Sequence, residues 1–388
     1  MKLNKIIALV IAAAAFFPAL LSAQSNQVSP YSRFGYGMLS DQANTAQRAM
    51  GGVGYAMRSG RQINFMNPAS YAAIDSLTFL FDMAVDLKHL NTSDNGEKGT
   101  KLTGGLDYIT MQAPITKWLG ASAGLIPYSE VGYSFGNEIV NGRNAHSGSG
   151  GINEVYLGFS ARPFKGFTLG FNASYLFGTI TNDTYIYGTS TSLFQRVTEV
   201  RDYNLRFGLQ YGFRFLTDHE ITFGAIYSPE KWLRGNTYGD IYDVTNDTGA
   251  TRLDERKLLH NAKMAATYGG GVSYSWQNRF LAEVDFTYQP WKDMKFASLE
   301  GFNDATGHFD NRWKANIGLQ FQNRFRGSWV QRVTYRLGAY YSNDYIKVGD
   351  NSVRETGVSL GFGLPAPSSK SVVNLALESV SYTHLTLP

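Results

Sequence analysis

The chain has 388 residues, of which 14% are aromatic, and its formal net charge is +4. It contains no cysteine, which excludes disulfide bonds and thiolate metal sites. No run of basic residues stands out, so the sequence does not favour nucleic-acid binding.

The first 23 residues have the layout of a cleavable secretory signal peptide. Lys2 and Lys5 precede an apolar run over residues 6–21, and Ser22-Ala23 provide small residues for cleavage. The remaining sequence has no other long apolar stretch. We therefore expect any membrane spans to be strands of a closed barrel, because only helices and barrels satisfy their backbone hydrogen bonds in lipid.

Residues 24–76 are rich in glycine and also contain many apolar side chains. Two interpretations are open: a disordered periplasmic arm, or a compact plug that folds back into a lumen. The apolar content favours the plug, because solvated tails have few large apolar residues. The hatch residues that we single out are Phe34, Tyr36, Gly51, Gly52, Gly54, Asn67, Pro68 and Ala69.

Strict alternation of apolar and polar residues marks the strands of the barrel. Over residues 203–215, aromatic or aliphatic side chains occupy every odd position, and polar residues or glycine occupy every even one. Lipid outside and water inside would produce this period of two. The pattern predicts thirteen strands near residues 77–87, 104–113, 119–133, 154–161, 167–177, 203–215, 219–227, 268–276, 280–289, 314–321, 333–341, 355–364 and 371–378.

Short and long connections alternate between these strands, as expected for periplasmic turns and extracellular loops. Long polar loops are expected near residues 91–103, 136–152, 180–202, 228–267, 291–310 and 342–353. Single-chain bacterial barrels close with an even number of strands, so we expect fourteen, with the last one lost by truncation. Residues 379–388 resemble translated adapter sequence and are expected to be a non-native tail, although a naturally irregular terminus is the alternative. The expected organisation is a signal peptide (1–23), a hatch (24–76), a barrel (77–378) and this tail.

Tryptophans provide a further check on the strand ends. Trp118, Trp276, Trp291, Trp313 and Trp329 all fall at or near them. Aromatic girdles at the two membrane interfaces have this distribution.

Several charged residues share the inward phase of the strands. Glu283 and Asp285 lie two residues apart, which could indicate paired catalytic carboxylates, but basic residues point inward as well. Lumenal salt bridges are the interpretation we favour. The predicted lumen-lining charges are Arg206, Arg214, Glu283, Asp285, Lys314 and Arg336.

Enzyme and metal motifs find little support in the sequence. Residues 357–361 fit a nucleophile-elbow pattern, but they lie within a predicted strand and not at a strand–turn–helix junction. The histidines are scattered over different connections, with no pair at metal-ligand spacing. We expect no catalytic residue, metal or cofactor.

Pro127 lies inside the third predicted strand, between Gly124 and Tyr128. A proline cannot donate to a strand ladder, and a closed barrel has no edge to accommodate one. Pro127 therefore predicts a bulge or kink where pairing fails and an apolar ligand could leave sideways. The alternative is a harmless bulge near the strand's end.

Two segments resemble the amino-terminal hatch of the FadL/TodX family of outer-membrane transporters for hydrophobic compounds. They are residues 48–56, which contain three glycines, and Asn67-Pro68-Ala69 shortly before the first strand. The resemblance implies a 14-stranded barrel and a kinked third strand with a lateral exit. Residues 29–37 resemble a divergent, mostly uncharacterised branch of that superfamily, which leaves the fatty-acid specificity open.

The resemblance implies passive uptake of hydrophobic small molecules across the outer membrane of a Gram-negative bacterium. A FadL-like component of a protein secretion or surface-assembly system is one alternative, and a structural or adhesin barrel is another. The expected partners of a monomeric barrel are outer-membrane lipid, a hydrophobic ligand and the barrel-assembly machinery.

The signal peptide generates the first testable prediction. Cleavage after Ala23 should give a mature protein that begins at Gln24. Intact-mass measurement of the membrane-extracted protein checks this, and retention of residues 1–23 would contradict both the signal and the export.

Overall fold

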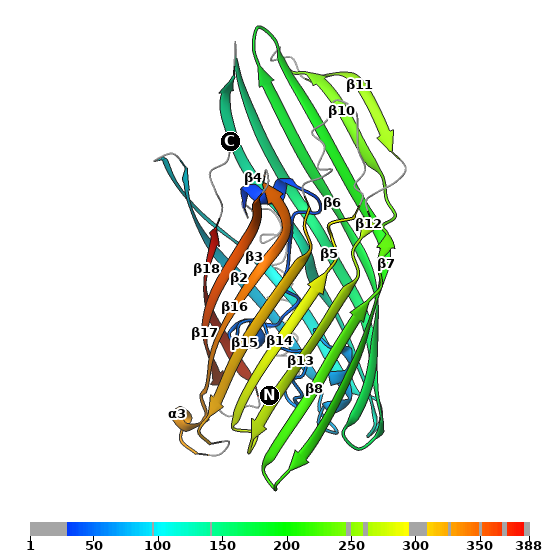
Figure 1. Ribbon diagram of the computed structural model, residues 1–388, viewed down its shortest axis with the longest axis vertical. Helices are drawn as coiled ribbons and strands as arrows, with labels where there is room; N and C mark the ends of the chain where they lie inside the picture. The colour runs from blue at the N-terminus through cyan, green and yellow to red at the C-terminus, as the bar shows by residue number, and fades with distance from the viewer. Residues whose placement is uncertain are drawn as a thin grey trace, which may run out of the picture.

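In the computed structural model, a large antiparallel sheet encloses an N-terminal segment (Figure 1). The structure describes residues 29–94, 97–139, 142–245, 250–258, 263–294, 309–324, 327–348, 351–366 and 371–383. The proposed signal peptide lies outside these residues. None of the helices in the described part of the chain is long and apolar enough to cross a membrane.

Wall strands follow one another in chain order around the sheet, each pairing with the next. This arrangement confirms the predicted all-β barrel fold with an internal hatch. The fourteenth strand stays a prediction. The wall strands are β2 (Leu80–Asp94), β3 (Glu97–Pro114), β4 (Leu119–Ile139), β5 (Gly142–Phe164), β6 (Phe167–Tyr187), β7 (Thr191–Phe215), β8 (His219–Ser228), β13 (Thr267–Trp276), β14 (Phe280–Gln289), β15 (Arg312–Gln322), β16 (Thr334–Val348), β17 (Asn351–Pro365) and β18 (Val372–Thr383).

Alternation of side chains along the strands confirms the two-faced pattern. In β7, Tyr203, Phe207 and Tyr211 are exposed on the outside, whereas Asn204 and Gln210 are buried toward the lumen. An apolar exterior and a polar interior are the arrangement of a transmembrane barrel.

Several expected long loops are strands instead. β4 to β7 continue through residues 136–152 and 180–202 as paired hairpins of 21 to 25 residues per strand, well beyond the 10 residues of β8. The expectation of loops was wrong because polar residues on both faces of a strand above the membrane weaken the alternation. Within 228–267, β10 (Thr237–Asp243) pairs with upper β7 and with β11 (Thr251–Leu258), and β9 (Lys231–Trp232) pairs with β12 (Lys263–Met264).

β2 and β18 are the first and the last strand of the wall (Figure 1). β18 continues five residues past Glu378, and Ser379 to Thr383 pair with β17. The first five residues of the predicted non-native tail, Ser379 to Thr383, therefore form part of a wall strand.

One predicted girdle tryptophan is not at the membrane interface. The Trp291 side chain is fully buried in the upper lumen, and its ring centroid lies 4.6 Å from that of Tyr345. Trp291 follows β14 and packs into the buried cluster that contains Tyr36 and Tyr345, so its position near a strand end did not indicate lipid exposure. Trp118, Trp276 and Trp329, by contrast, are exposed.

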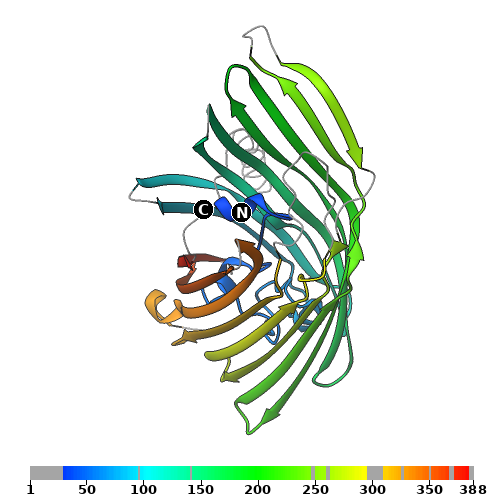
Figure 2. The same ribbon diagram turned by 45° about the horizontal axis from the view of Figure 1, so that its top comes forward.

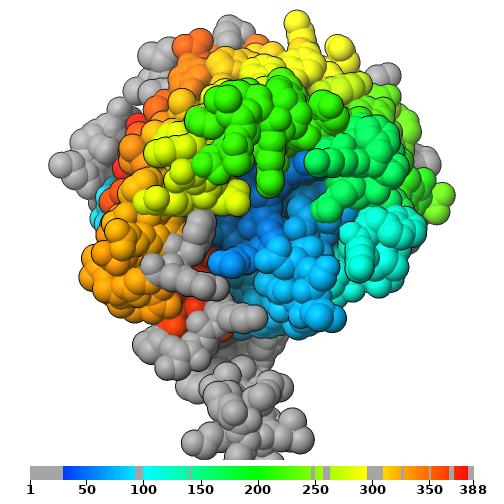
Figure 3. Space-filling view, turned by 90° about the horizontal axis from the view of Figure 1, so that it is seen from below, coloured from blue at the N-terminus to red at the C-terminus, as the bar shows by residue number. Residues whose placement is uncertain are grey.

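The hatch enters the lumen beside β4 and descends toward the start of β2 (Figures 1 and 2). It consists of short elements joined by glycine-rich turns: 3-10 helix η1 (Pro30–Arg33), β1 (Met38–Leu39), α2 (Thr45–Arg48) and 3-10 helix η2 (Pro68–Ala73). A short helix α3 (Trp329–Arg332) lies outside the lumen, before β16. Seen from below, hatch atoms fill the opening of the barrel (Figure 3).

Inward-facing glycines let the hatch backbone touch the wall. A Cβ on Gly224 would lie 1.9 Å from the carbonyl oxygen of Tyr55, and a Cβ on Gly338 would lie 2.0 Å from the amide nitrogen of Gly51. We call these residues the glycine belt. Its members, each of which would meet hatch atoms, are Gly120, Gly158, Gly170, Gly208, Gly224, Gly271, Gly318, Gly338 and Gly361.

The belt generates a stability prediction with a matched control. Gly224→Ala should destabilise the folded barrel by about 1–3 kcal/mol, because the added methyl group meets backbone that cannot retreat. Gly270→Ala, in the neighbouring strand, should have little effect, because a Cβ there makes only an ordinary contact, 3.9 Å from the carbonyl oxygen of Gly224. Urea unfolding followed by heat-modifiable gel mobility measures both, and equal stability of the two variants would contradict close contact at the belt.

Candidate functional site

Two buried wall carboxylates hold the middle of the hatch. Asp285 accepts hydrogen bonds from the amides of Gly54 and Tyr55 at 2.7 and 2.9 Å, and Glu283 accepts one from Ala56 at 2.7 Å. Buried backbone amides need hydrogen-bond partners of this kind. Glu283 and Asp285, which the sequence predicted to face the lumen, therefore contact the hatch backbone.

Further wall side chains bind the hatch from other sides of the lumen. Ser359 of β17 accepts from the amide of Gly51 at 2.8 Å, and Gln210 of β7 donates to the carbonyl of Tyr55 at 2.9 Å. From the hatch, Asn67 donates to the Leu209 carbonyl of β7 at 3.2 Å. The lower hatch, residues 49–72, is therefore held by hydrogen bonds with β7, β14 and β17 at the level of the glycine belt.

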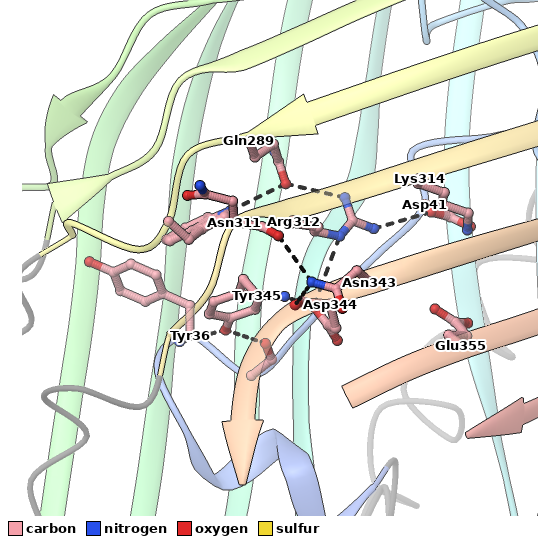
Figure 4. A network of polar contacts seen from close by, with 12 residues as sticks. Tyr36, Asp41, Gln289, Asn311, Arg312, Lys314, Asn343, Asp344, Tyr345 and Glu355 are labelled. Atoms are coloured by element: carbon pink, nitrogen blue, oxygen red, sulfur yellow. Dashed lines mark hydrogen bonds and ion pairs between the residues drawn. The ribbon is translucent and has the colours of Figure 1, made fainter. Parts of the chain in front are cut away.

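Asp41 follows the upper hatch, which we define as residues 29–40, and links it to basic residues of β15 (Figure 4). It forms an ion pair with Lys314 and lies 3.7 Å from Arg312, which also contacts Asp344 at 3.9 Å. Burial raises the pKa of Asp41, but the charges of Lys314 and Arg312 outweigh burial and leave the pKa below its ordinary value. Asp41 therefore stays ionised, which keeps the ion pair intact at neutral pH.

A cavity of about 80 Å³ remains between the hatch and the wall. Its apolar lining includes Leu39, Tyr128 and Met264, and its charged lining includes Arg206 and Lys314. Arg206 donates to Gln42, whose amide donates to Glu154 at 2.5 Å. Because Leu39 and Tyr128 belong to β1 and β4, the cavity lies directly behind these two strands.

β4 loses its pairing with β3 halfway up the wall. The ladder between them ends at Ile109 and Leu125, although β4 continues to Ile139 and the β2–β3 hairpin continues away from it (Figure 2). We call the gap between residues 100–108 of β3 and residues 126–139 of β4 the seam. No other adjacent pair of wall strands in the described part of the chain separates over such a length.

Pro127 lies at the lower end of the seam. The register between β4 and β5 shifts between Pro127 and Ser129, so Tyr128 is the extra residue of a bulge. The bulge also changes which positions face inward: even-numbered Ile126 is buried below it, Tyr128 is buried within it, and odd-numbered Val131 and Tyr133 are buried above it. The sequence prediction of a bulge at Pro127 agrees with this geometry.

The hatch covers the upper edge of β4 where β3 has left. Met38 and Leu39 of β1 pair with Glu130 and Ser129, and the Ser29 amide donates to the Gly132 carbonyl at 3.1 Å. An ion pair between Lys88 of β2 and Glu130 of β4, at 2.5 Å, crosses the seam.

Predicted site residues fall into three groups. Tyr128 follows Pro127 at the lower end of the seam, and Gly124 lies just below it, where β3 and β4 still pair. Phe34 and Tyr36 lie in the upper hatch, where the Tyr36 amide donates to the Tyr345 hydroxyl at 3.2 Å. At the belt are Gly51, Gly52, Gly54, Asn67, Pro68, Ala69, Glu283 and Asp285, while Arg206 and Lys314 line the cavity above it.

Arg214 and Arg336 do not join these groups. The Arg214 side chain is exposed at the end of β7 and pairs with Glu220 at 2.9 Å, so it lies at the rim. Arg336 is buried and donates to Gln320 and Asn374 in the lower wall.

Sequence reasoning missed Asp41, Gln42, Arg312, Lys88 and Glu130. Lys88 had a signal, because it has the inward phase of its strand. Asp41 and Gln42 had none, since their wall partners lie far away in the sequence. Among the described residues, no cluster of three or more His, Asp or Glu side chains could hold a metal ion.

Solved structures show which folds this arrangement resembles. The CymD monoaromatic hydrocarbon channel aligns with a TM-score of 0.59 and 14% identity, over 90% of this chain and 94% of its own. A Pseudomonas aeruginosa FadL homologue aligns with a TM-score of 0.57 and 11% identity, over 89% of this chain and 90% of its own. The Pseudomonas putida toluene transporter TodX aligns with a TM-score of 0.55 and 15% identity, over 88% of this chain and 93% of its own. At these identities the likeness establishes the fold.

At the sequence level, no curated protein matches the chain. The family model of BamG matches residues 3–382. Because this match spans nearly the whole sequence, the chain belongs to the BamG family.

Proposed function

We propose that this protein is an outer-membrane channel for hydrophobic small molecules, which leave sideways through the seam. The observation that carries the proposal is the difference between two levels of the barrel. At the belt, the hatch backbone contacts the wall and blocks a straight path, whereas above the belt β3 and β4 are unpaired. In this proposal, a compound that enters from outside leaves through the seam.

The lining of the upper lumen supports an apolar cargo. Tyr31, Tyr36, Tyr128 and Tyr133 form one cluster with Met38 of β1, immediately beside the seam. Aromatic side chains give large apolar contact areas for small ligands. The structural neighbours include a monoaromatic hydrocarbon channel and a toluene transporter, which supports the same class of cargo.

In this proposal the hatch has two parts with different tasks. The lower part, residues 49–72, blocks the lumen permanently, and the upper part, residues 29–40, moves away from β4 to open the seam. The charged residues Arg206 and Lys314 keep the hatch in place and do not contact the cargo. The protein works as a monomer in outer-membrane lipid, with no cofactor, and the barrel-assembly machinery inserts it.

A second candidate function is favoured by the family match. The BamG name points to the barrel-assembly machinery, so the chain would be a fixed component of that complex and the plugged lumen would serve no transport. Co-purification of this protein with the complex, together with loss of other outer-membrane proteins after its depletion, would favour this candidate. Normal levels of those proteins after depletion would speak against it.

A reversible clamp on β1 tests the channel. Leu39 and Ser129 are direct partners, and the chain has no native cysteine, so Leu39→Cys/Ser129→Cys should form one disulfide between hatch and wall. Uptake of toluene by cells should fall to background when the disulfide is oxidised and return after reduction. Ala173→Cys/Leu205→Cys, across the fully paired β6 and β7, is the control. Undiminished uptake by the oxidised clamp would remove the proposal.

Pro127→Ala provides an independent test. Alanine restores a backbone donor at the bulge, so β4 should pair more regularly and the seam should narrow. Apolar uptake should decrease while the thermal midpoint of the gel mobility shift stays the same or rises. Unchanged uptake by a well-folded variant would mean that the bulge has no part in release.

A further inference from the structure

Three arginine side chains gather on the periplasmic rim of the barrel, the end where the turns are short. Arg279 lies between β13 and β14, and Arg324 and Arg332 lie between β15 and β16. The second connection contains α3, which stands outside the lumen at this rim (Figure 1). Arg324 is exposed, and Arg279 and Arg332 are half-buried. We call these three residues the arginine patch.

Hydrogen bonds between the two connections bring the arginines together. Arg279 donates from its guanidinium to the Asn323 side chain at 3.2 Å, immediately before Arg324. The Arg324 amide donates to the Gln331 carbonyl at 2.9 Å, immediately before Arg332. The three positive charges therefore originate from one small area of the rim.

No carboxylate pairs with the arginine patch in the described part of the chain. None of its members forms an ion pair there, and residues 311–343 contain no Asp or Glu. Asp218 lies in the adjacent β7–β8 turn, but it accepts a hydrogen bond from Gln277 at 3.2 Å. Arg252 of the extracellular β11, by contrast, contacts Asp240 at 2.7 Å. A concentrated positive charge of this kind attracts anions.

Exposed apolar side chains in the same connections place the patch at the level of lipid headgroups. Trp276, the last residue of β13, is 42% exposed, and Trp329 and Val330 of α3 are 45% and 62% exposed. Tryptophan is enriched at the membrane–water interface, because its ring is apolar and its N–H needs a polar partner. The Trp329 indole donates to the Pro365 carbonyl at 2.8 Å. The neighbouring guanidinium groups therefore lie at the depth of lipid phosphates.

We propose that the arginine patch is a binding site for the headgroup of an anionic phospholipid in the periplasmic leaflet. A planar guanidinium can donate two parallel hydrogen bonds to phosphate oxygens, and clustered basic residues beside a membrane favour lipids with a net negative charge. Trp329 and Val330 contact the acyl chains of the same lipid. The site lies on the outer surface of the wall, so this inference does not depend on transport through the lumen or the seam.

Native mass spectrometry of the full chain in detergent tests the site, with phosphatidylglycerol and phosphatidylethanolamine as probes. Both lipids carry a phosphate, but only phosphatidylglycerol has a net charge. The unmodified protein should retain phosphatidylglycerol at a several-fold lower lipid concentration than phosphatidylethanolamine. Arg279→Gln/Arg324→Gln/Arg332→Gln should abolish this preference, because it removes the charges and leaves the apolar contacts.

A matched control removes three arginines from the extracellular end. Arg143→Gln/Arg252→Gln/Arg256→Gln changes the net charge equally, in β5 and β11, and should retain phosphatidylglycerol like the unmodified protein. The gel mobility shift checks the folding of both variants, and Arg324→Gln alone replaces the patch variant if that variant does not fold. Loss of the preference in the patch variant alone supports the site.

Three results would overturn the proposal. They are equal retention of the two lipids by the unmodified protein, an unchanged preference in the folded patch variant, and the same loss in the control. Inorganic phosphate provides a further arm, since it has the charge but no acyl chains. Full displacement of phosphatidylglycerol by an equal concentration of inorganic phosphate would show a site for free phosphate and would likewise contradict a lipid site.

Discussion

Close approach of the hatch backbone to inward-facing glycines is the constraint on which the rest of this structure depends. Gly224 and Gly338 leave no room for a methyl group between wall and hatch, and the same is true around the lumen at this level. Backbone can then come near enough for the wall's polar side chains to bond it, as Asp285 does with Gly54 and Tyr55. The lower hatch is consequently part of the folded wall, and a barrel with larger residues at the belt could not hold it.

Above the glycine belt the wall is less regular, because β3 and β4 separate at the seam. Where the belt closes the lumen, β3 and β4 are paired; above it, the bulge at Tyr128 coincides with the end of their ladder. The upper hatch compensates by pairing β1 with β4, and Lys88 compensates by reaching Glu130 across the gap. Both compensations are small compared with a regular ladder between two wall strands. In the proposed channel, the upper part of the hatch separates from the wall while the lower part stays at the belt.

Alternation along the strands predicted the barrel because each wall side chain faces either lipid or the lumen. The resulting pattern of apolar and polar residues can be read within a single strand. The bulge at Pro127 was also predictable, since a missing amide has the same meaning in any ladder. The extension of β4 to β7 above the membrane was not, because alternation fades where water lies on both sides. The prediction for Trp291 was wrong for a related reason: a position near a strand end does not reveal whether the side chain faces lipid or packs inside the barrel.

The candidate site was predictable in part. Glu283, Asp285 and Lys314 were identified as inward charges, but their partners were not, since Asp41 and Gly54 lie more than 200 residues away in the sequence. The glycine belt escaped notice because its nine glycines come from nine different wall strands, one from each, and isolated glycines in strands have many explanations. Their common level becomes visible once the register of the sheet is known.

Native-state hydrogen exchange, resolved by residue in lipid nanodiscs, tests the central claim most directly: a lower hatch fixed at the belt and an upper hatch that separates from the seam. Amides of Gly54, Tyr55 and Ala56 should exchange as slowly as those of the central wall strands, since their release requires opening of the belt. Amides of Met38 and Leu39 should exchange much faster. Equal protection of the two groups would contradict the account, because the hatch would then move, or remain fixed, as one unit.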